Sequence, residues 1–298
     1  MSSNPAETVD FELDADGSVP RRVEVDCSGL SDKGLVRQNN EDHFLIGRFG
    51  RFLKPLQTNI ANPPPDDFLQ EGYGLVVADG VGGHRGGEIA SELAIRTLRE
   101  LALDTSDWII SAGKLEAQRV MARMADRYRK IDAALTDRAQ ADPLLSKMAT
   151  TMTLACSVGP SMILAHVGDS RAYLFRAGKL HQLTRDHTLA QEMLDQGEIQ
   201  RLEDASQSTR HALMRVLGSA ASYCTADVDH LALADQDQIL LCTDGLTDMV
   251  ANDVIAALVS ESPTAAQACQ KLVAEALKNG GKDNVTVVVG RYRIFANE

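Results

Sequence analysis

The chain has 298 residues, and its 42 Asp and Glu against 30 Lys and Arg give a formal net charge of −12. Because nucleic-acid binding depends on clustered Lys and Arg, this acidic balance argues against a nucleic-acid-binding protein. No stretch contains the roughly 18 apolar residues that a membrane-spanning helix needs, and the N-terminus does not show a secretory-signal pattern.

The first 20 residues differ in composition from the rest of the chain. They contain Glu7, Asp10, Glu12, Asp14 and Asp16 but no Lys or Arg, which is typical of a disordered segment. We therefore expect an acidic tail over residues 1–20 and one folded domain over residues 21–298.

Strands are predicted over residues 23–28, 42–46 and 74–78, where short apolar runs are bounded by polar residues. Between the last two, an extra loop is expected over residues 47–72. It contains the run Pro63-Pro64-Pro65, and proline removes the backbone donors that a strand uses.

Two long helices follow. Apolar residues recur at three- and four-residue spacing over residues 90–101 and 121–135, which is the pattern of amphipathic helices. Asp142-Pro143 ends this pair, because the residue before proline disfavours helical geometry.

The remaining chain is mostly strand and contains a second helix pair before the last strand. Strands are expected over 150–158, 162–167, 172–175, 180–183, 238–242 and 285–292, and helices over 252–260 and 264–277. Blocks of strands alternating with paired helices predict an α+β fold of stacked layers. The five cysteines form no Cys-x-x-Cys pair, which indicates reduced thiols and a cytoplasmic protein.

Aspartates stand where these predicted strands begin or end. Asp79, Asp169 and Asp244 each follow an apolar strand, and Asp283 precedes the last one. Carboxylates that share a sheet edge repel one another unless a cation neutralises them, and oxygen ligands select Mg²⁺ or Mn²⁺. An Asp-Gly pair is also a common turn, so the residues alone allow either a metal site or simple turns.

A polar segment from Arg37 to Asp42 precedes a predicted strand. A guanidinium group can hold a phosphate through two parallel hydrogen bonds, and Glu41 and Asp42 would then lie near the metal. Taken by itself, the segment is more typical of an ordinary charged loop.

In chain order, these segments resemble the metal-dependent protein phosphatase family, the type-2C Ser/Thr phosphatases, in their bacterial form. The matching segments are 31–42, 77–84, 149–151, 166–171, 183–187, 243–248 and 283–286. The resemblance implies a four-layer α-β-β-α sandwich, in which two antiparallel sheets are flanked by helix pairs, with a flap over about 190–222. It also implies hydrolysis of phosphoserine and phosphothreonine by in-line attack of a metal-bridging hydroxide, which would counteract bacterial Ser/Thr kinases.

The resemblance also implies roles for individual residues. Two Mn²⁺ or Mg²⁺ ions would be bound by Asp79, Gly80, Asp244, Asp283, Asp42 and Glu41. Arg37, Asp79, Asp244 and Asp283 would be catalytic, Arg37 and His84 would bind substrate, and Asp169, Asp248 and Asn284 would support the ligands. A third ion is not implied, because Ser146 replaces the aspartate that binds it in bacterial relatives.

Several alternatives stay open at this level. Val81 replaces the proposed general-acid histidine of many eukaryotic relatives, and His84 either acts at the phosphate or packs the loop. The same fold also occurs in catalytically inactive binding modules and in phosphatases dedicated to one small regulatory phosphoprotein. We expect phosphorylated proteins and Ser/Thr kinases as partners of a monomer that binds neither nucleic acid nor membrane.

Overall fold

The computed structural model describes residues 23–53, 68–81, 85–104, 114–219 and 224–295. The predicted acidic tail over residues 1–20 and His84 lie outside these ranges. All five cysteines are described, and none forms a disulfide. None of the helices in these ranges is long and apolar enough to cross a bilayer.

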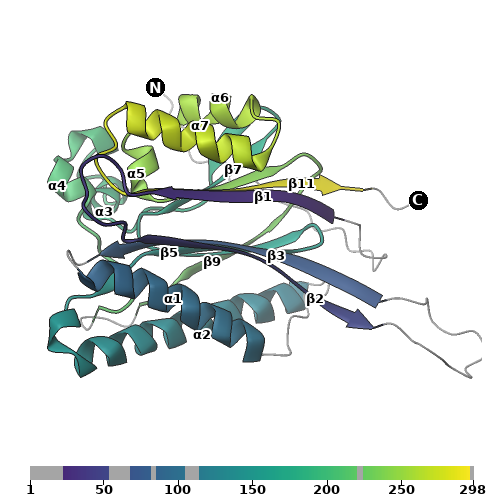
Figure 1. Cartoon of the computed structure of the whole chain (residues 1–298), viewed down its shortest axis with the longest axis horizontal. Helices are drawn as coiled ribbons and strands as arrows, with labels where there is room; N and C mark the ends of the chain where they lie inside the picture. Colours follow the sequence, from purple (N-terminus) through teal and green to yellow (C-terminus); the bar gives the residue numbers. More distant parts are fainter. Residues whose placement is uncertain (1–22, 54–67, 82–84, 105–113, 220–223, 296–298) are drawn as a thin grey trace, which may run out of the picture.

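Two antiparallel sheets stack face to face, and a helix pair covers each outer face (Figure 1). Helices α1 (Arg85–Asp104) and α2 (Lys114–Ala141) cover one sheet. Helices α6 (Asn252–Ser260) and α7 (Ala265–Lys278) cover the other. The predicted four-layer α-β-β-α sandwich is therefore confirmed.

The sheet under α1 and α2 is six-stranded within the described ranges and runs in the order β2-β3-β5-β6-β9, with β4 attached to β3. Its strands are β2 (Asp42–Leu53), β3 (Phe68–Val81), β4 (Ala149–Thr150), β5 (Met152–Val158), β6 (Ser161–Val167) and β9 (Asp227–Ala232).

The sheet under α6 and α7 is five-stranded over the same part of the chain and runs in the order β1-β11-β10-β7-β8. Its strands are β1 (Val23–Asp32), β7 (Arg171–Arg176), β8 (Lys179–Gln182), β10 (Gln238–Cys242) and β11 (Val285–Ile294).

Three apolar layers hold the sandwich together. In β3, Leu75 and Val77 point between the sheets, whereas Val76 and Ala78 point toward α1 and α2, because successive side chains of a strand alternate between its faces. Both faces are buried, which explains why the strand is one continuous apolar run. Polar residues can therefore stand only at its ends.

The expected loop over residues 47–72 is wrong at both ends. β2 continues to Leu53 and β3 begins at Phe68, and the two residues pair directly. The described register does not include the proline run at 63–65. Residues 54–67 lie outside the described ranges.

Two further differences concern polar strand residues. The strand expected over 150–158 is interrupted at Thr151, which separates β4 from β5. β9 was not predicted, because it is an edge strand that mixes Asp227, Asp229 and His230 with apolar residues and pairs only with β6 in the described sheet.

Short helices gather at one end of the sandwich. Helices α3 (Leu189–Asp195), α4 (Gln207–Arg210) and α5 (Asp244–Thr247) lie at the same end as the loop that follows β1 (Figure 1). The 3₁₀ turns are η1 (Pro143–Leu145) and η2 (Leu202–Asp204). The strand ends that carry the predicted aspartates open toward this end.

Truncation of the α7 core side chain Leu272 should be strongly destabilising. Leu272 is fully buried against the five-stranded sheet, so Leu272→Ala should lower the free energy of unfolding by about 2–5 kcal/mol. Val254→Ala on neighbouring α6 serves as the control, because Val254 is 37% exposed and should change stability by less than about 0.5 kcal/mol. Urea unfolding of the two variants would contradict the packing described here if their losses were equal.

Candidate active site

The strand ends of both sheets bring acidic side chains together at one end of the sandwich. Asp42 opens β2 and lies directly opposite Asp79 near the end of β3. Asp244 is the first residue of α5, two positions after the end of β10, and Asp283 lies two positions before β11. Residues that are 37 to 241 positions apart thus meet, because each sheet contributes two neighbouring strands.

These carboxylates interact electrostatically. Burial raises the pKa of Asp79 well above its usual range, and the next causes are the charges of Asp42, Asp244, Asp169 and Asp283. Each negative charge opposes ionisation of its neighbours. Five of the predicted acids therefore form one interacting cluster.

The backbone around Asp79 is held by threonines. Asp79 O accepts hydrogen bonds from Thr151 N at 2.9 Å and Thr150 Oγ1 at 2.8 Å, while Asp79 N donates to Thr151 Oγ1 at 3.1 Å. These bonds are made where Thr151 interrupts the strand between β4 and β5. They fix the backbone of Asp79, the central acid of the cluster.

Gly80 allows the start of α1 to approach this point. A Cβ at Gly80 would lie 2.2 Å from Gly87 O, which leaves no room for any side chain. Gly80 N donates to Glu41 O at 3.2 Å. The backbone of Gly80 and the Glu41 segment therefore lie side by side next to Asp79.

Asp42 is buried, and its two oxygens have unequal surroundings. Oδ2 accepts hydrogen bonds from Thr243 Oγ1 at 2.9 Å and Thr286 Oγ1 at 2.8 Å, whereas Oδ1 is buried with no partner among the described residues. Burial raises the pKa of Asp42 to about 7, although the two hydroxyls act in the opposite direction. Neither threonine was predicted as a site residue; the signal in the sequence is a single hydroxyl in an otherwise all-valine run at 285–289.

Asp169 lies in the turn between β6 and β7 and is buried. Burial raises the pKa of Asp169 well above its ordinary value, and the charge of Asp244 is the next cause. The turn is anchored on both sides, since Gly168 N donates to His187 Nδ1 at 3.1 Å and Ser170 Oγ lies 2.9 Å from Thr151 Oγ1. Asp169 thus joins the edge of the cluster on a fixed turn.

Arg37 lies on the loop between β1 and β2 at the solvent side of the cluster. Its Nη2 donates to Asp283 Oδ2 at 2.6 Å, and 55% of its side chain is exposed. The hydrogen bond to Asp283 raises the pKa of Arg37, and the charges of Glu41 and Asp79 add to this effect. The guanidinium is therefore both accessible and oriented beside the acids.

Asn284 fastens this loop to the sheet. Its Nδ2 donates to Lys33 O at 2.9 Å and to Asn39 O at 2.8 Å, and its Oδ1 accepts from Glu41 N at 2.8 Å. The three bonds span the segment that contains Arg37. Asn284 is thus placed to support the site through the backbone.

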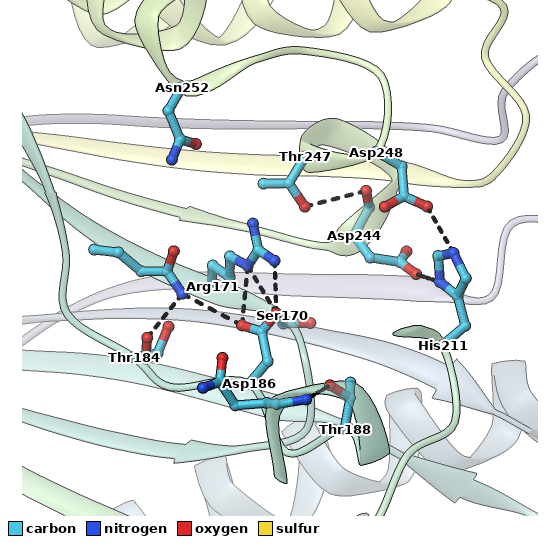
Figure 2. Close-up of polar contacts among 12 residues, drawn as sticks. Ser170, Arg171, Thr184, Asp186, Thr188, His211, Asp244, Thr247, Asp248 and Asn252 are labelled. Carbon is cyan, nitrogen blue, oxygen red and sulfur yellow. Dashed lines mark hydrogen bonds and ion pairs between the residues drawn. The ribbon is translucent and has the colours of Figure 1, made fainter. Parts of the chain in front are cut away.

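His211 is a site residue that the sequence analysis did not identify. Figure 2 shows it facing Asp244 and Asp248, with Nδ1 3.6 Å from Asp244 Oδ2 and Nε2 3.4 Å from Asp248 Oδ2. The pair with Asp244 is the main reason that the pKa of His211 is raised. Because its two ring nitrogens face different carboxylates, the imidazole bridges them. No spacing motif connects His211 to α5.

A partly buried ion pair supports the same end of the sandwich. Arg171 donates to Asp186 through Nε at 2.9 Å and Nη2 at 2.6 Å (Figure 2). This bidentate pair ties β7 to the segment that leads into α3. The pair thereby anchors the start of the segment 189–213, which contains His211.

Sequence comparisons identify relatives of the chain. A model of the family described as protein phosphatase 2C matches residues 70–285. The Serine/threonine protein phosphatase PstP of Mycobacterium tuberculosis is 35% identical over 259 residues, which are 87% of this chain and 43% of PstP. The chain thus spans less than half the length of that relative. The Serine/threonine phosphatase stp of Listeria monocytogenes is 31% identical, with 87% of this chain and 92% of the relative covered.

Solved structures agree with this similarity. The catalytic domain of PstP in complex with two manganese ions has a TM-score of 0.72 and 31% identity, covering 91% of this chain and 100% of that domain. The serine/threonine phosphatase of S. agalactiae has a TM-score of 0.74 and 28% identity, covering 90% of this chain and 99% of that one. With a family model over most of its length and two sheets that end in the same acidic cluster, the chain belongs to the protein phosphatase 2C family.

Proposed function

We propose that this protein is a metal-dependent protein serine/threonine phosphatase that binds two Mn²⁺ or Mg²⁺ ions at the acidic end of the sandwich. One observation carries the proposal: half-buried Asp79 lies among four other carboxylates, and their charges oppose its ionisation. Such a cluster is stable at neutral pH only with bound cations or bound protons.

The donor set fits a hard divalent cation. Every predicted ligand is an oxygen, and the buried Asp42 Oδ1 has no protein partner among the described residues. Asp79, the Gly80 carbonyl, Asp244 and Asp283 would hold one ion, and Glu41 and Asp42 would act at the second. Bound ions of this kind supply a hydroxide nucleophile at neutral pH and neutralise phosphoryl charge.

The chain itself supplies phosphate recognition. Arg37 is exposed and held beside Asp283, so a phosphorylated side chain can reach its guanidinium from solvent. Its positive charge would hold the phosphoryl oxygens and stabilise the additional charge of the transition state. Asp169 and Asp248 would tune the cluster without binding the ions directly.

The substrates would be phosphoserine and phosphothreonine in proteins, and the enzyme would oppose Ser/Thr kinases in the cytoplasm as a monomer. The names of the bacterial relatives support this substrate class. We also propose that His84 acts at the phosphate. His84 lies outside the described ranges.

Replacement of the central carboxylate should abolish activity. Asp79→Asn removes the charge at the middle of the cluster and should eliminate both Mn²⁺ binding and Mn²⁺-stimulated hydrolysis of p-nitrophenyl phosphate. Asp253→Asn on the exposed surface of α6 is the matched control and should behave as wild type. If wild-type protein were no faster with Mn²⁺ than with EDTA, the proposed function would be wrong.

Loss of the guanidinium should weaken phosphate recognition. Arg37→Ala should lower kcat/KM for a phosphothreonine peptide by about 100-fold, because a preorganised positive charge at the phosphoryl group is lost. Arg48→Ala, which removes an exposed arginine of β2, should leave kcat/KM unchanged. Equal effects of the two substitutions in steady-state kinetics would contradict the role of Arg37.

Stability of the metal-free protein should fall as the pH rises. The pKa of Asp42 is raised from 3.8 to about 7 by burial in the folded state. The folded protein therefore holds a proton that the unfolded chain releases above about pH 4, and the associated stability is lost as the pH passes about 7.

Urea unfolding in EDTA between about pH 4 and pH 8 measures this loss. Asp42→Asn should reduce the pH dependence, and Mn²⁺ should restore stability at the upper end because it binds the folded state. An unchanged pH profile in Asp42→Asn would show that Asp42 does not retain the proton.

A further inference from the structure

We propose that Thr243 and Thr286 are positioning residues for Asp42, which hold Oδ2 of its carboxylate and reserve Oδ1 for a bound cation. This inference rests on the proposed function, because it concerns the metal site suggested there. It assigns a role to two buried hydroxyls that do not themselves touch the phosphate or the ions.

The two threonines belong to the sheet opposite Asp42. Thr243 follows β10 and Thr286 is the second residue of β11, and the two segments pair through Thr243 N to Thr286 O at 3.0 Å. Asp42 opens β2 in the other sheet. The two hydroxyl–carboxylate bonds therefore cross the sandwich and connect the sheets at the acidic end.

The donors in this network have only one arrangement. An ionised carboxylate only accepts, so when Asp42 is charged both hydroxyls donate their single hydrogen to Asp42 Oδ2. Thr243 Oγ1 in turn accepts from Thr286 N at 3.0 Å. Thr286 Oγ1 has no hydrogen left for Ser31 Oγ at 2.7 Å, so Ser31 must be the donor of that bond.

The chain of donors continues to Asn40. Asn40 Nδ2 donates to Ser31 Oγ at 2.7 Å, and Asn40 Oδ1 accepts from Asp42 N at 3.2 Å. Hydrogen bonds thus run in one direction, from Asn40 through Ser31 and Thr286 to the carboxylate of Asp42. The same asparagine holds the backbone of Asp42, so the residue is fixed at both ends.

This arrangement treats the two oxygens of Asp42 differently. Oδ2 receives two donors, whereas Oδ1 is buried and receives none from the described residues. A buried oxygen without a partner is costly, and such atoms usually mark a bound ion or water. Thr243 and Thr286 are both fully buried, so solvent cannot replace their hydroxyls as the groups that orient the carboxylate.

The test compares Thr286→Val with Thr286→Ser. Valine keeps the branched shape but removes both the donor to Asp42 and the acceptor of Ser31, whereas serine keeps both. Isothermal titration calorimetry with Mn²⁺ should show one of the two binding steps weakened roughly 10- to 100-fold in Thr286→Val, and binding close to wild type in Thr286→Ser. Thr243→Val is less suitable, because it also deprives Thr286 N of its acceptor.

Two controls separate positioning from loss of stability. Tyr292→Phe removes another buried hydroxyl of β11, which bonds Ser157 at 3.0 Å, and should leave Mn²⁺ binding unchanged even if thermal unfolding shifts. In the Asp42→Asn background, Thr286→Val should add no further loss of affinity, because the threonine acts through the carboxylate.

The outcomes distinguish this inference from the proposed function. Normal Mn²⁺ affinity in Thr286→Val, or a full additional loss in the Asp42→Asn background, would overturn the positioning role while the phosphatase function stands. Wild-type protein that neither binds Mn²⁺ nor hydrolyses phosphate would overturn both. Wild-type Mn²⁺ affinity in Thr286→Ser, together with no further loss when Thr286→Val is added to Asp42→Asn, would establish the role.

Discussion

Repulsion among buried and half-buried aspartates is the constraint on which the rest of this structure depends. Asp79 lies where burial and the charges of four other carboxylates all oppose its ionisation. A folded chain keeps such a cluster only if rigid surroundings prevent the acids from moving apart and cations or protons compensate their charge. Three features provide the rigid surroundings: the threonine bonds to the backbone of Asp79, the close approach of Gly80 to Gly87, and the bonds of Asn284 to the loop that contains Arg37.

The sandwich meets that constraint by using both sheets. Asp42 and Asp79 are neighbours on β2 and β3, while Asp244 and Asp283 adjoin β10 and β11. The apolar layer between the sheets fixes the separation of these two pairs. Hydroxyl bonds from Thr243 and Thr286 then join the sheets at the point where the apolar layer ends.

Two side chains of the site come from connecting segments and are held in different ways. Arg37 lies on a loop that Asn284 fastens to β11, so phosphate recognition is coupled directly to the acidic cluster. His211 comes from the segment between α3 and β9 and faces Asp244, which begins α5, and Asp248, which follows it. The site therefore combines a rigid floor of strand ends with one solvent-facing arginine and one histidine from a long connection.

The sequence by itself determined the layers and most of the acids. Continuous apolar runs predicted the buried strands, helical periodicity predicted α1, α2, α6 and α7, and aspartates at strand ends marked one edge. The polar edge strand β9 and the outer parts of β2 and β3 escaped prediction, because their patterns do not differ from those of loops. Only the tertiary structure decided that Asp42 lies opposite Asp79, that Thr243 and Thr286 bind its carboxylate, and that His211 reaches α5. The local pattern of apolar residues indicates which segments are buried. Register between strands and contact between sheets depend on residues up to about 240 positions apart, and sequence spacing carries no signal for those.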